Sequence, residues 1–264
     1  MTNTDADKTT VEPEIVVTAD GSIRIVTLNR PDAHNAFSEP MHREFVRVIS
    51  AIDNDSGARA VVLTGAGRSF CAGGSLDDFE AKRTNFEARR QSMRDARRLV
   101  DEMLNLRVPV VAAVNGPAVG LGCTLVTLCD IVFMASKAFL SDPHVAVALV
   151  AGDGGAVTWP SHTSLLHAKQ YLLTGDRIPA AVAVTLGLAN FAVSEDEVLP
   201  LALAFARRLS NLPPQAVQDT KMVLNQHLRQ SAVSVLGYGL AAESQSHDTE
   251  QYREIARGGS ARGR

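Results

Sequence analysis

The sequence has only three cysteines in 264 residues, and none of them forms a Cys-x-x-Cys pair. Cys71, Cys123 and Cys129 therefore provide neither a disulfide framework nor the closely spaced thiols of a structural zinc site. The first residues are polar and acidic, which does not fit a secretory signal peptide. We therefore expect a protein of the reducing cytoplasm that carries no metal ion.

Long apolar runs, aromatic side chains and an excess of one charge are also missing. No run reaches the roughly 18 to 20 apolar residues that a membrane span needs. Aromatic residues make up 5% of the chain, and 26 basic against 29 acidic residues leave a net charge of −3. Such a chain lacks the basic surface and the stacking platforms of a nucleic-acid binder. We expect a globular protein that binds neither nucleic acid nor a membrane.

Hydrophobic patterns predict an α/β protein whose C-terminal part is helical. Two β-branched runs flank Asp20 and Gly21, which is typical of a β-hairpin. Short runs that are apolar on both faces suit strands covered by helices, and they occupy residues 60–64, 110–114 and 131–134. Helical spacing predicts helices over residues 41–52, 85–106, 122–129, 201–209, 213–228 and 231–255. Beyond about residue 160 the pattern is almost entirely helical.

Two glycine-rich segments carry the candidate chemistry. Residues 70–76 come after the first of these strands, and residues 115–124 follow the second and open a helix. Glycine lets the backbone approach a ligand closely, and a helix that begins there leaves unpaired N–H groups. Each segment alone also fits a simple tight turn. Together, two such turns can direct one N–H each at a single oxygen, as stabilisation of an oxyanion requires.

The order of these motifs resembles the enoyl-CoA hydratase/isomerase (crotonase) superfamily over roughly residues 14–255. The matching segments are residues 28–31, 35–36, 61–76, 109–116, 120–130, 172–175 and 187–189. The resemblance implies a crotonase-like spiral of ββα turns, followed by a helical C-terminal region that packs subunits into trimers or hexamers. It divides the chain into a flexible tail (1–13), the spiral core with the acyl-CoA site (14–200) and a helical oligomerisation region with a loose basic end (201–264).

The resemblance also implies a site for an acyl-CoA thioester, whose coenzyme arrives with the substrate, so no separate cofactor is expected. Two backbone N–H groups of such proteins polarise the thioester carbonyl and stabilise an enolate. The matching donors in this sequence are Gly74 and Leu121. The positions that match the substrate groove are Ala36, Ala72, Leu76 and Gly120.

The acid–base residues depart from the pattern of hydratases that use two glutamates. Thr124 takes the place of the first glutamate, and a hydroxyl is no base near neutral pH. His144, which follows Pro143, takes the place of the second, and Asp153 lies where some isomerases and dehalogenases of the superfamily carry an aspartate. Structural roles stay open: a wall residue for His144, and a turn residue or helix cap for Asp153. Asp142 either orients His144 or is a loop charge.

These residues predict an enzyme that hydrates an enoyl-CoA or moves its double bond. Gly74 and Leu121 would hold the oxyanion, and Asp153 or His144 would move the proton. A single carboxylate suffices for isomerisation, which favours that reaction on chemical grounds. Two alternatives stay open: a thioester hydrolase or dehalogenase with Asp153 as nucleophile, and a CoA-binding protein without catalysis.

Overall fold

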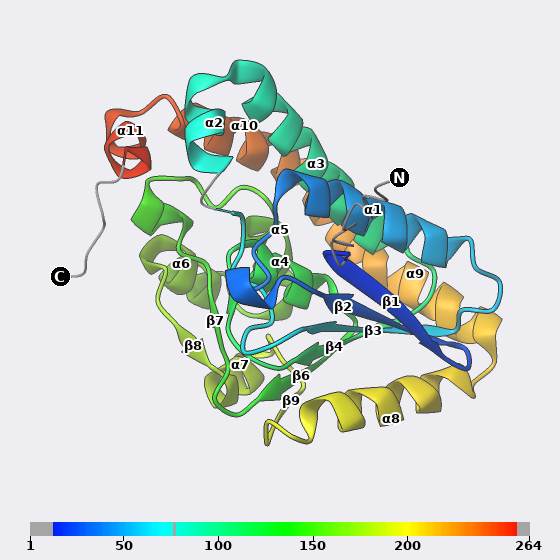
Figure 1. The fold of residues 1–264 in the computed structure, drawn as a ribbon. Coiled ribbons are helices and arrows are strands. Elements are labelled where there is room, and N and C mark those ends of the chain that lie inside the picture. Colours follow the sequence, from blue (N-terminus) through cyan, green and yellow to red (C-terminus); the bar gives the residue numbers. More distant parts are fainter. Residues whose placement is uncertain (1–12, 76–77, 258–264) are drawn as a thin grey trace, which may run out of the picture.

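The computed structural model describes residues 13–75 and 78–257, so the expected groove residue Leu76 lies outside the described part. A hairpin is followed by strands that alternate with helices, and then by a helical C-terminal part (Figure 1). The strands are β1 (Ile15–Asp20), β2 (Ile23–Leu28), β3 (Ala60–Gly65), β4 (Val110–Val114), β5 (Ala118–Val119), β6 (Ile131–Ala135), β7 (Phe139–Ser141), β8 (Ile178–Pro179) and β9 (Phe191–Val193). The helices are α1 (Glu39–Asp53), α2 (Asp78–Thr84), α3 (Phe86–Asn105), α4 (Leu121–Leu128), α5 (Gly155–His162), α6 (Leu165–Thr174), α7 (Ala180–Leu186), α8 (Val198–Ser210), α9 (Pro214–Ser231), α10 (Gly237–Ser246) and α11 (Glu250–Ala256).

The strands form two mixed sheets. The larger has the order β1-β2-β3-β4-β6-β9, in which β1 and β2 are antiparallel and every other pair is parallel. The smaller has the order β5-β7-β8, with a parallel and then an antiparallel pair. The hairpin predicted around Asp20 and Gly21 is confirmed, and Gly21 takes the positive φ of 59° that its turn requires. The three strands predicted from apolar runs are confirmed as β3, β4 and β6.

Helices cover the larger sheet on both faces, which explains why its central strands are apolar throughout. In Figure 1, α1 and α3 lie above the sheet and α8 runs below it, where it contacts β3, β4 and β6. Every residue of β4 is buried. The predicted boundary between residues 200 and 201 falls in the first turn of α8, and the division into domains stays a prediction.

A buried lysine ties the C-terminal helices to the sheet. Lys221 of α9 lies 2.8 Å from Asp130 Oδ2 and donates to the carbonyl of Val108 at 2.8 Å. Only 6% of this lysine is exposed, so the ion pair holds α9 against the ends of β4 and β6.

One expectation for the C-terminal third is wrong. The helix predicted over residues 231–255 runs through a π-helical turn (Ala232–Leu236) into α10, but it is interrupted before α11. Thr249 explains this break, because its hydroxyl accepts a hydrogen bond from the Tyr252 N–H and caps α11. The almost entirely helical pattern after residue 160 is confirmed: the described part of this region holds only two short strands, β8 and β9, and β9 extends the large sheet by pairing with β6.

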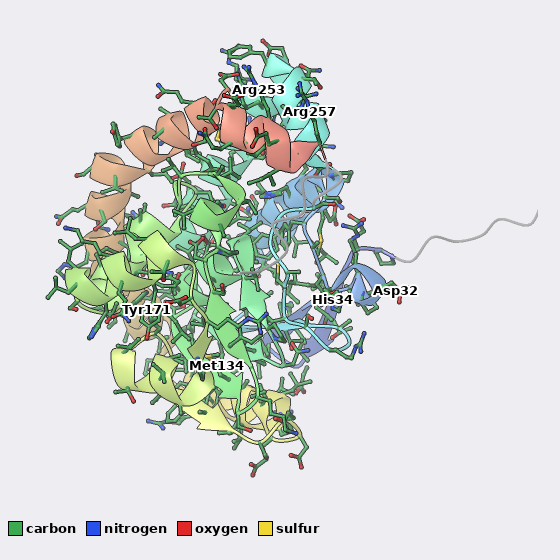
Figure 2. The ribbon with its side chains drawn as sticks, turned by 90° about the vertical axis from the view of Figure 1, so that its left-hand side faces the viewer. Asp32, His34, Met134, Tyr171, Arg253 and Arg257 are labelled. Carbon is green, nitrogen blue, oxygen red and sulfur yellow. The ribbon has the colours of Figure 1, made fainter. Side chains whose placement is uncertain are left out.

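The last helix packs against a helix from the first third of the chain. Figure 2 shows α11, which carries Arg253 and ends just before Arg257, beside the cyan α2, and the two helices are in contact. All three cysteines are buried and unpaired. None of the helices in the described part is both long and apolar enough to cross a membrane.

Candidate active site

A cavity of about 160 Å³ lies where the two glycine turns, the loop before α5 and the C-terminal helices meet. One part of its lining, here called the amide wall, consists of Gly73, Gly74, Gly120 and Leu121. A second part, here called the carboxyl wall, consists of His144, Asp153 and Glu243. Further ionisable side chains in the lining are His42, Lys82 and His247. Backbone donors and titratable groups therefore share one space.

Backbone hydrogen bonds fix the first turn of the amide wall. Phe37 donates its N–H to the Gly73 carbonyl at 2.7 Å, and its own carbonyl accepts from the Ser75 N–H at 2.8 Å. Gly73 has a φ of +94°, and a Cβ atom there would lie 2.9 Å from the Val119 carbonyl oxygen. Only glycine fits this position, and the two turns touch each other here.

The second turn presents the beginning of a helix to the cavity. The Gly120 N–H donates to the Ser141 carbonyl at 2.8 Å, and α4 begins at the next residue, Leu121. Among the described residues, no protein group accepts a hydrogen bond from the N–H of Leu121 or of Gly74. Both amides belong to the cavity lining, so both are available to a ligand oxygen.

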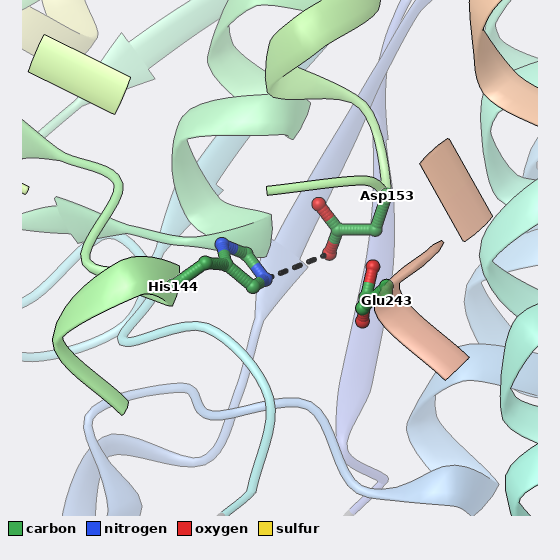
Figure 3. Close-up of side chains that lie close together, drawn as sticks. All are labelled: His144, Asp153 and Glu243. Carbon is green, nitrogen blue, oxygen red and sulfur yellow. Dashed lines mark ion pairs between the residues drawn. The ribbon is translucent and has the colours of Figure 1, made fainter. Parts of the chain in front are cut away.

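In the carboxyl wall, His144 lies between two aspartates. Its Nδ1 makes a short hydrogen bond with Asp142 Oδ1, and its Nε2 lies 3.6 Å from Asp153 Oδ2 (Figure 3). Asp142 is fully buried, and the side chains of His144 and Asp153 are only 12% and 13% exposed. Asp142 therefore orients the imidazole, and the imidazole in turn faces Asp153.

The electrostatics of this trio favour a charged imidazole. Burial opposes the positive charge, but the Asp142 and Asp153 carboxylates outweigh it and raise the pKa of His144 well above its usual value. Burial raises the pKa of Asp153, although the neighbouring His144 opposes the rise. Asp153 Oδ1 has no hydrogen-bond partner among the residues that the structure describes. The result is an imidazolium beside an aspartate that is a stronger base than an exposed one.

Glu243 of α10 is a functional candidate that sequence reasoning missed. Figure 3 shows its carboxyl group beside that of Asp153, and donor atoms of Glu243, Asp153 and His144 lie within 4.8 Å of one another. Burial, and then the charge of Asp153, raises the pKa of Glu243 to about 8. The only signal in the sequence is an acid that follows the apolar run Leu240, Ala241 and Ala242 on a predicted helix. That signal does not say which part of the fold the acid faces.

The carboxyl wall suits protons better than a metal ion. The described part of the chain has one group of side chains whose possible metal-ligand atoms lie close enough together to bind a cation. This group consists of His144, Asp153 and Glu243. An imidazole with a raised pKa keeps its proton and offers no lone pair on Nε2. The expectation that no metal is needed stays a prediction.

Comparison with known proteins identifies the family. A family model described as enoyl-CoA hydratase/isomerase matches residues 18–259. The chain belongs to the enoyl-CoA hydratase/isomerase family. It is 31% identical over 241 residues to a short-chain-enoyl-CoA hydratase of Clostridium acetobutylicum, covering 91% of this chain and 92% of that protein. It is 32% identical over 233 residues to the 2,3-dehydroadipyl-CoA hydratase of Escherichia coli, covering 88% of each.

The solved structures of this family confirm the predicted fold class. The crystal structure of an enoyl-CoA hydratase/isomerase from Mycobacterium paratuberculosis is 51% identical and superposes with a TM-score of 0.89. The match covers 92% of this chain and 97% of that one. The two mixed sheets and the long helical C-terminal region therefore form the α/β crotonase fold.

The structure brings most of the expected site residues of this hydratase/isomerase family member together. The cavity lining includes the following expected residues: Ala72, Gly74, Gly120, Leu121, His144 and Asp153. Ala36 lies outside the lining, one residue before the Phe37 that pairs with Gly74.

Thr124, at the place of the first glutamate of two-glutamate hydratases, does not reach the cavity. It is fully buried, and a Cβ atom on Gly154 would lie 2.2 Å from its Cγ2 methyl group. The loop that carries Asp153 thus packs directly over Thr124. A glutamate at position 124 would collide with this loop.

Proposed function

We propose that this protein catalyses proton transfer on an enoyl-CoA thioester, as hydration or as isomerisation of its double bond. The family supports an acyl-CoA substrate, and the relatives from Clostridium acetobutylicum and Escherichia coli are both named as hydratases. The observation that carries the proposal is that one cavity is lined by two amides without an acceptor among the described residues and by an aspartate whose pKa burial raises. No further cofactor takes part, because the coenzyme is a portion of the substrate.

In this proposal the amides of Gly74 and Leu121 bind the thioester carbonyl oxygen. As a proton leaves the α-carbon, or as hydroxide adds to the β-carbon, negative charge builds on that oxygen. Amides that are already fixed by the surrounding hydrogen bonds stabilise this charge without reorganising. Loss of one such donor raises a barrier by about 3 to 4 kcal/mol.

Asp153 is the group that takes the proton. His144 and Asp142 hold it in place, since the imidazolium faces the Asp153 carboxylate and is itself fixed by the buried Asp142. In isomerisation the same carboxylate removes a proton from one carbon of the acyl chain and returns it to another. In hydration it removes a proton from the attacking water.

The test is a pair of turnover assays on the purified protein. With crotonyl-CoA and octenoyl-CoA, hydration appears as loss of the absorbance of the conjugated thioester. With 3-enoyl-CoA substrates, isomerisation appears as a gain of that absorbance without uptake of water. Binding by calorimetry without turnover in either assay would contradict the proposal and favour a CoA-binding protein without catalysis.

Because Asp153 Oδ1 has no hydrogen-bond partner among the described residues, it could also attack a substrate as a nucleophile, and the test therefore covers this second reaction class. If Asp153 were a nucleophile, as in thioester hydrolysis or dehalogenation, rapid quenching during turnover would trap an acyl-aspartyl species. We expect no such species, because the proposed role of Asp153 is to carry a proton.

We also propose that the chain forms a trimer or hexamer. Helix α9, the π-helical turn that follows it and α10 expose large apolar side chains, namely Val223, Leu224, Val233 and Tyr238. Apolar side chains that gather on one region of a surface are typical of an interface. Light scattering coupled to size exclusion would measure the mass, and a monomer at micromolar concentration would contradict this assembly.

A further inference from the structure

Glu243 reaches the cavity because two glycines allow an unusually close approach of backbones. Gly239 on α10 contacts Gly152 in the loop before α5: a Cβ atom on Gly152 would lie 2.2 Å from the Gly239 carbonyl oxygen. In the other direction, a Cβ atom on Gly239 would lie 2.7 Å from the Gly152 carbonyl oxygen. Gly152 precedes Asp153, and Gly239 lies one helical turn before Glu243. The contact therefore places the two carboxyl groups side by side.

A second contact holds the same loop against the same helix. The Val150 N–H donates to Ser246 Oγ at 3.2 Å. The position of Glu243 is thus determined at both ends of α10, and the residue is only 6% exposed. Within the described part of the chain, its Oε2 atom has no hydrogen-bond partner.

Two buried carboxyl groups this close cannot both be charged without a large cost. The cost is lower when the pair binds one proton, because the two carboxyl groups then carry a single negative charge. Burial and the charge of Asp153 raise the pKa of Glu243 to about 8. Asp153 Oδ2 lies 3.6 Å from His144 Nε2, so the proton of the pair is assigned to Glu243 and the negative charge to Asp153. The cavity then contains a neutral acid and a base, which is the arrangement that addition of water requires.

We propose that Glu243 is a catalytic acid and that the reaction of this site is the hydration of an enoyl-CoA. The inference rests on the proposed function and adds to it. Asp153 removes a proton from water, and the hydroxide forms a bond to C3. The π electrons of the C2–C3 double bond move into the enolate held by Gly74 and Leu121, and then form a C–H bond to C2 with the proton of Glu243.

The atoms balance over one turnover. The substrate gains one water and becomes a 3-hydroxyacyl thioester, Asp153 has gained a proton and Glu243 has lost one. Transfer of that proton from Asp153 to Glu243 restores the starting state. No oxidant, reductant or metal ion enters the reaction. Glu243 thus supplies the second carboxyl group that Thr124 does not.

The experiment compares two reactions that share only part of the machinery. Exchange of the α-protons of butyryl-CoA with deuterium oxide is the step at C2 alone, so it needs the amide wall and Glu243. Hydration of crotonyl-CoA needs Asp153 as well. For Glu243→Gln we expect both hydration and exchange to fall about 100-fold or more, whereas Asp153→Asn should lose hydration and keep exchange within about threefold of the unmodified protein. The matched control is Glu254→Gln on α11, an exposed glutamate, which should leave both rates unchanged.

Glu243→Asp keeps the acid but shortens it, and it serves as the second variant if Glu243→Gln does not fold. We expect it to retain part of the hydration activity, with a high-pH limit that moves from the value near 8. The charged and titratable side chains that surround residue 243 come from all the elements packed against it, and they are Asp153, His144, Asp142, Lys82 and His247. A purely structural role of Glu243 would lower both reactions in Glu243→Asp as far as in Glu243→Gln and leave the pH profile in place, and exchange that survives in Glu243→Gln would overturn the catalytic role.

The possible outcomes distinguish a failure of the role proposed for Glu243 from a failure of the proposed function itself. Unmodified protein that neither hydrates nor exchanges overturns both. Protein that exchanges and isomerises but does not hydrate overturns only the role of Glu243, as does full hydration by Glu243→Gln. Hydration that a chelator removes and zinc restores would assign the three side chains to a cation and would also overturn it.

Discussion

The two walls of the cavity are built in opposite ways. In the amide wall the carbonyl of Gly73 and the N–H of Gly120 are paired with main-chain groups of the protein, at 2.7 and 2.8 Å. In the carboxyl wall one oxygen each of Asp153 and Glu243 has no hydrogen-bond partner in residues 13–75 and 78–257, and the same holds for one oxygen of the Asp142 behind them. The first wall is rigid and neutral, and the second holds buried charge that the fold tolerates at a cost.

This difference indicates a division of labour. Backbone donors keep their position whatever side chain they carry, so a leucine at position 121 is acceptable beside a ligand oxygen. Carboxyl groups change charge with their surroundings, so their chemistry depends on which groups pack around them. Substitutions that affect one wall and spare the other measure this division directly.

The largest effect is expected for Asp153→Asn. The amide cannot accept a proton, so we expect kcat for hydration or isomerisation to fall about 1,000-fold or more, while the affinity for the CoA thioester changes little. Steady-state kinetics and calorimetry on the same preparation measure the two quantities. Asp196→Asn, at an exposed turn, is the control. A variant that keeps a tenth of the activity would remove Asp153 from the reaction.

Gly73→Ala tests the amide wall and comes next. The added Cβ atom would lie 2.9 Å from the Val119 carbonyl and would push the two turns apart, so we expect kcat to fall about 100-fold through a misplaced amide. Gly21→Ala is matched to it, because Gly21 also has a positive φ but has no atom within 4 Å of the added methyl group. Both variants should lose stability, which thermal unfolding measures, and only Gly73→Ala should lose activity.

Sequence patterns predicted the amide wall better than the carboxyl wall. Local chemistry creates the glycine turns: apolar strands end there, and α4 begins within the glycine-rich segment itself. The resemblance then assigned the donors Gly74 and Leu121. It assigned Asp153 as a candidate in the same way, and the roles of all three residues stay predictions.

Glu243 could not be found from the sequence. It is 90 residues from Asp153, and the Gly152–Gly239 contact that joins them depends on how α10 packs. The helical pattern also predicted one helix where Thr249 introduces a break, because spacing alone does not reveal a cap. Long-range packing, rather than local preference, determines this part of the molecule.

A smaller effect is expected on stability and its dependence on pH. The pKa of Glu243 is about 8 in the folded protein against 4.5 for an ordinary glutamate, so this group contributes stability below 4.5 that is lost as the pH rises through 8. Glu243→Gln removes this loss. We expect its Tm to equal that of the unmodified protein near pH 4 and to exceed it by about 3 °C or more near pH 9. Thermal unfolding at both values checks this, and a difference that grows toward low pH would contradict the buried neutral acid.

The smallest effect is expected for Thr124→Val, which probes the contact between the two walls. Thr124 lies on α4 behind the amide wall and packs under Gly154 of the loop that carries Asp153. Its hydroxyl is buried without a hydrogen-bond partner, so replacing it by a methyl group of the same shape should leave the Tm unchanged or raise it slightly. Because Thr124 does not line the cavity, kcat should stay within about twofold. A 100-fold loss would mean that the hydroxyl positions a proton after all, and the two walls would then act through one shared residue rather than separately.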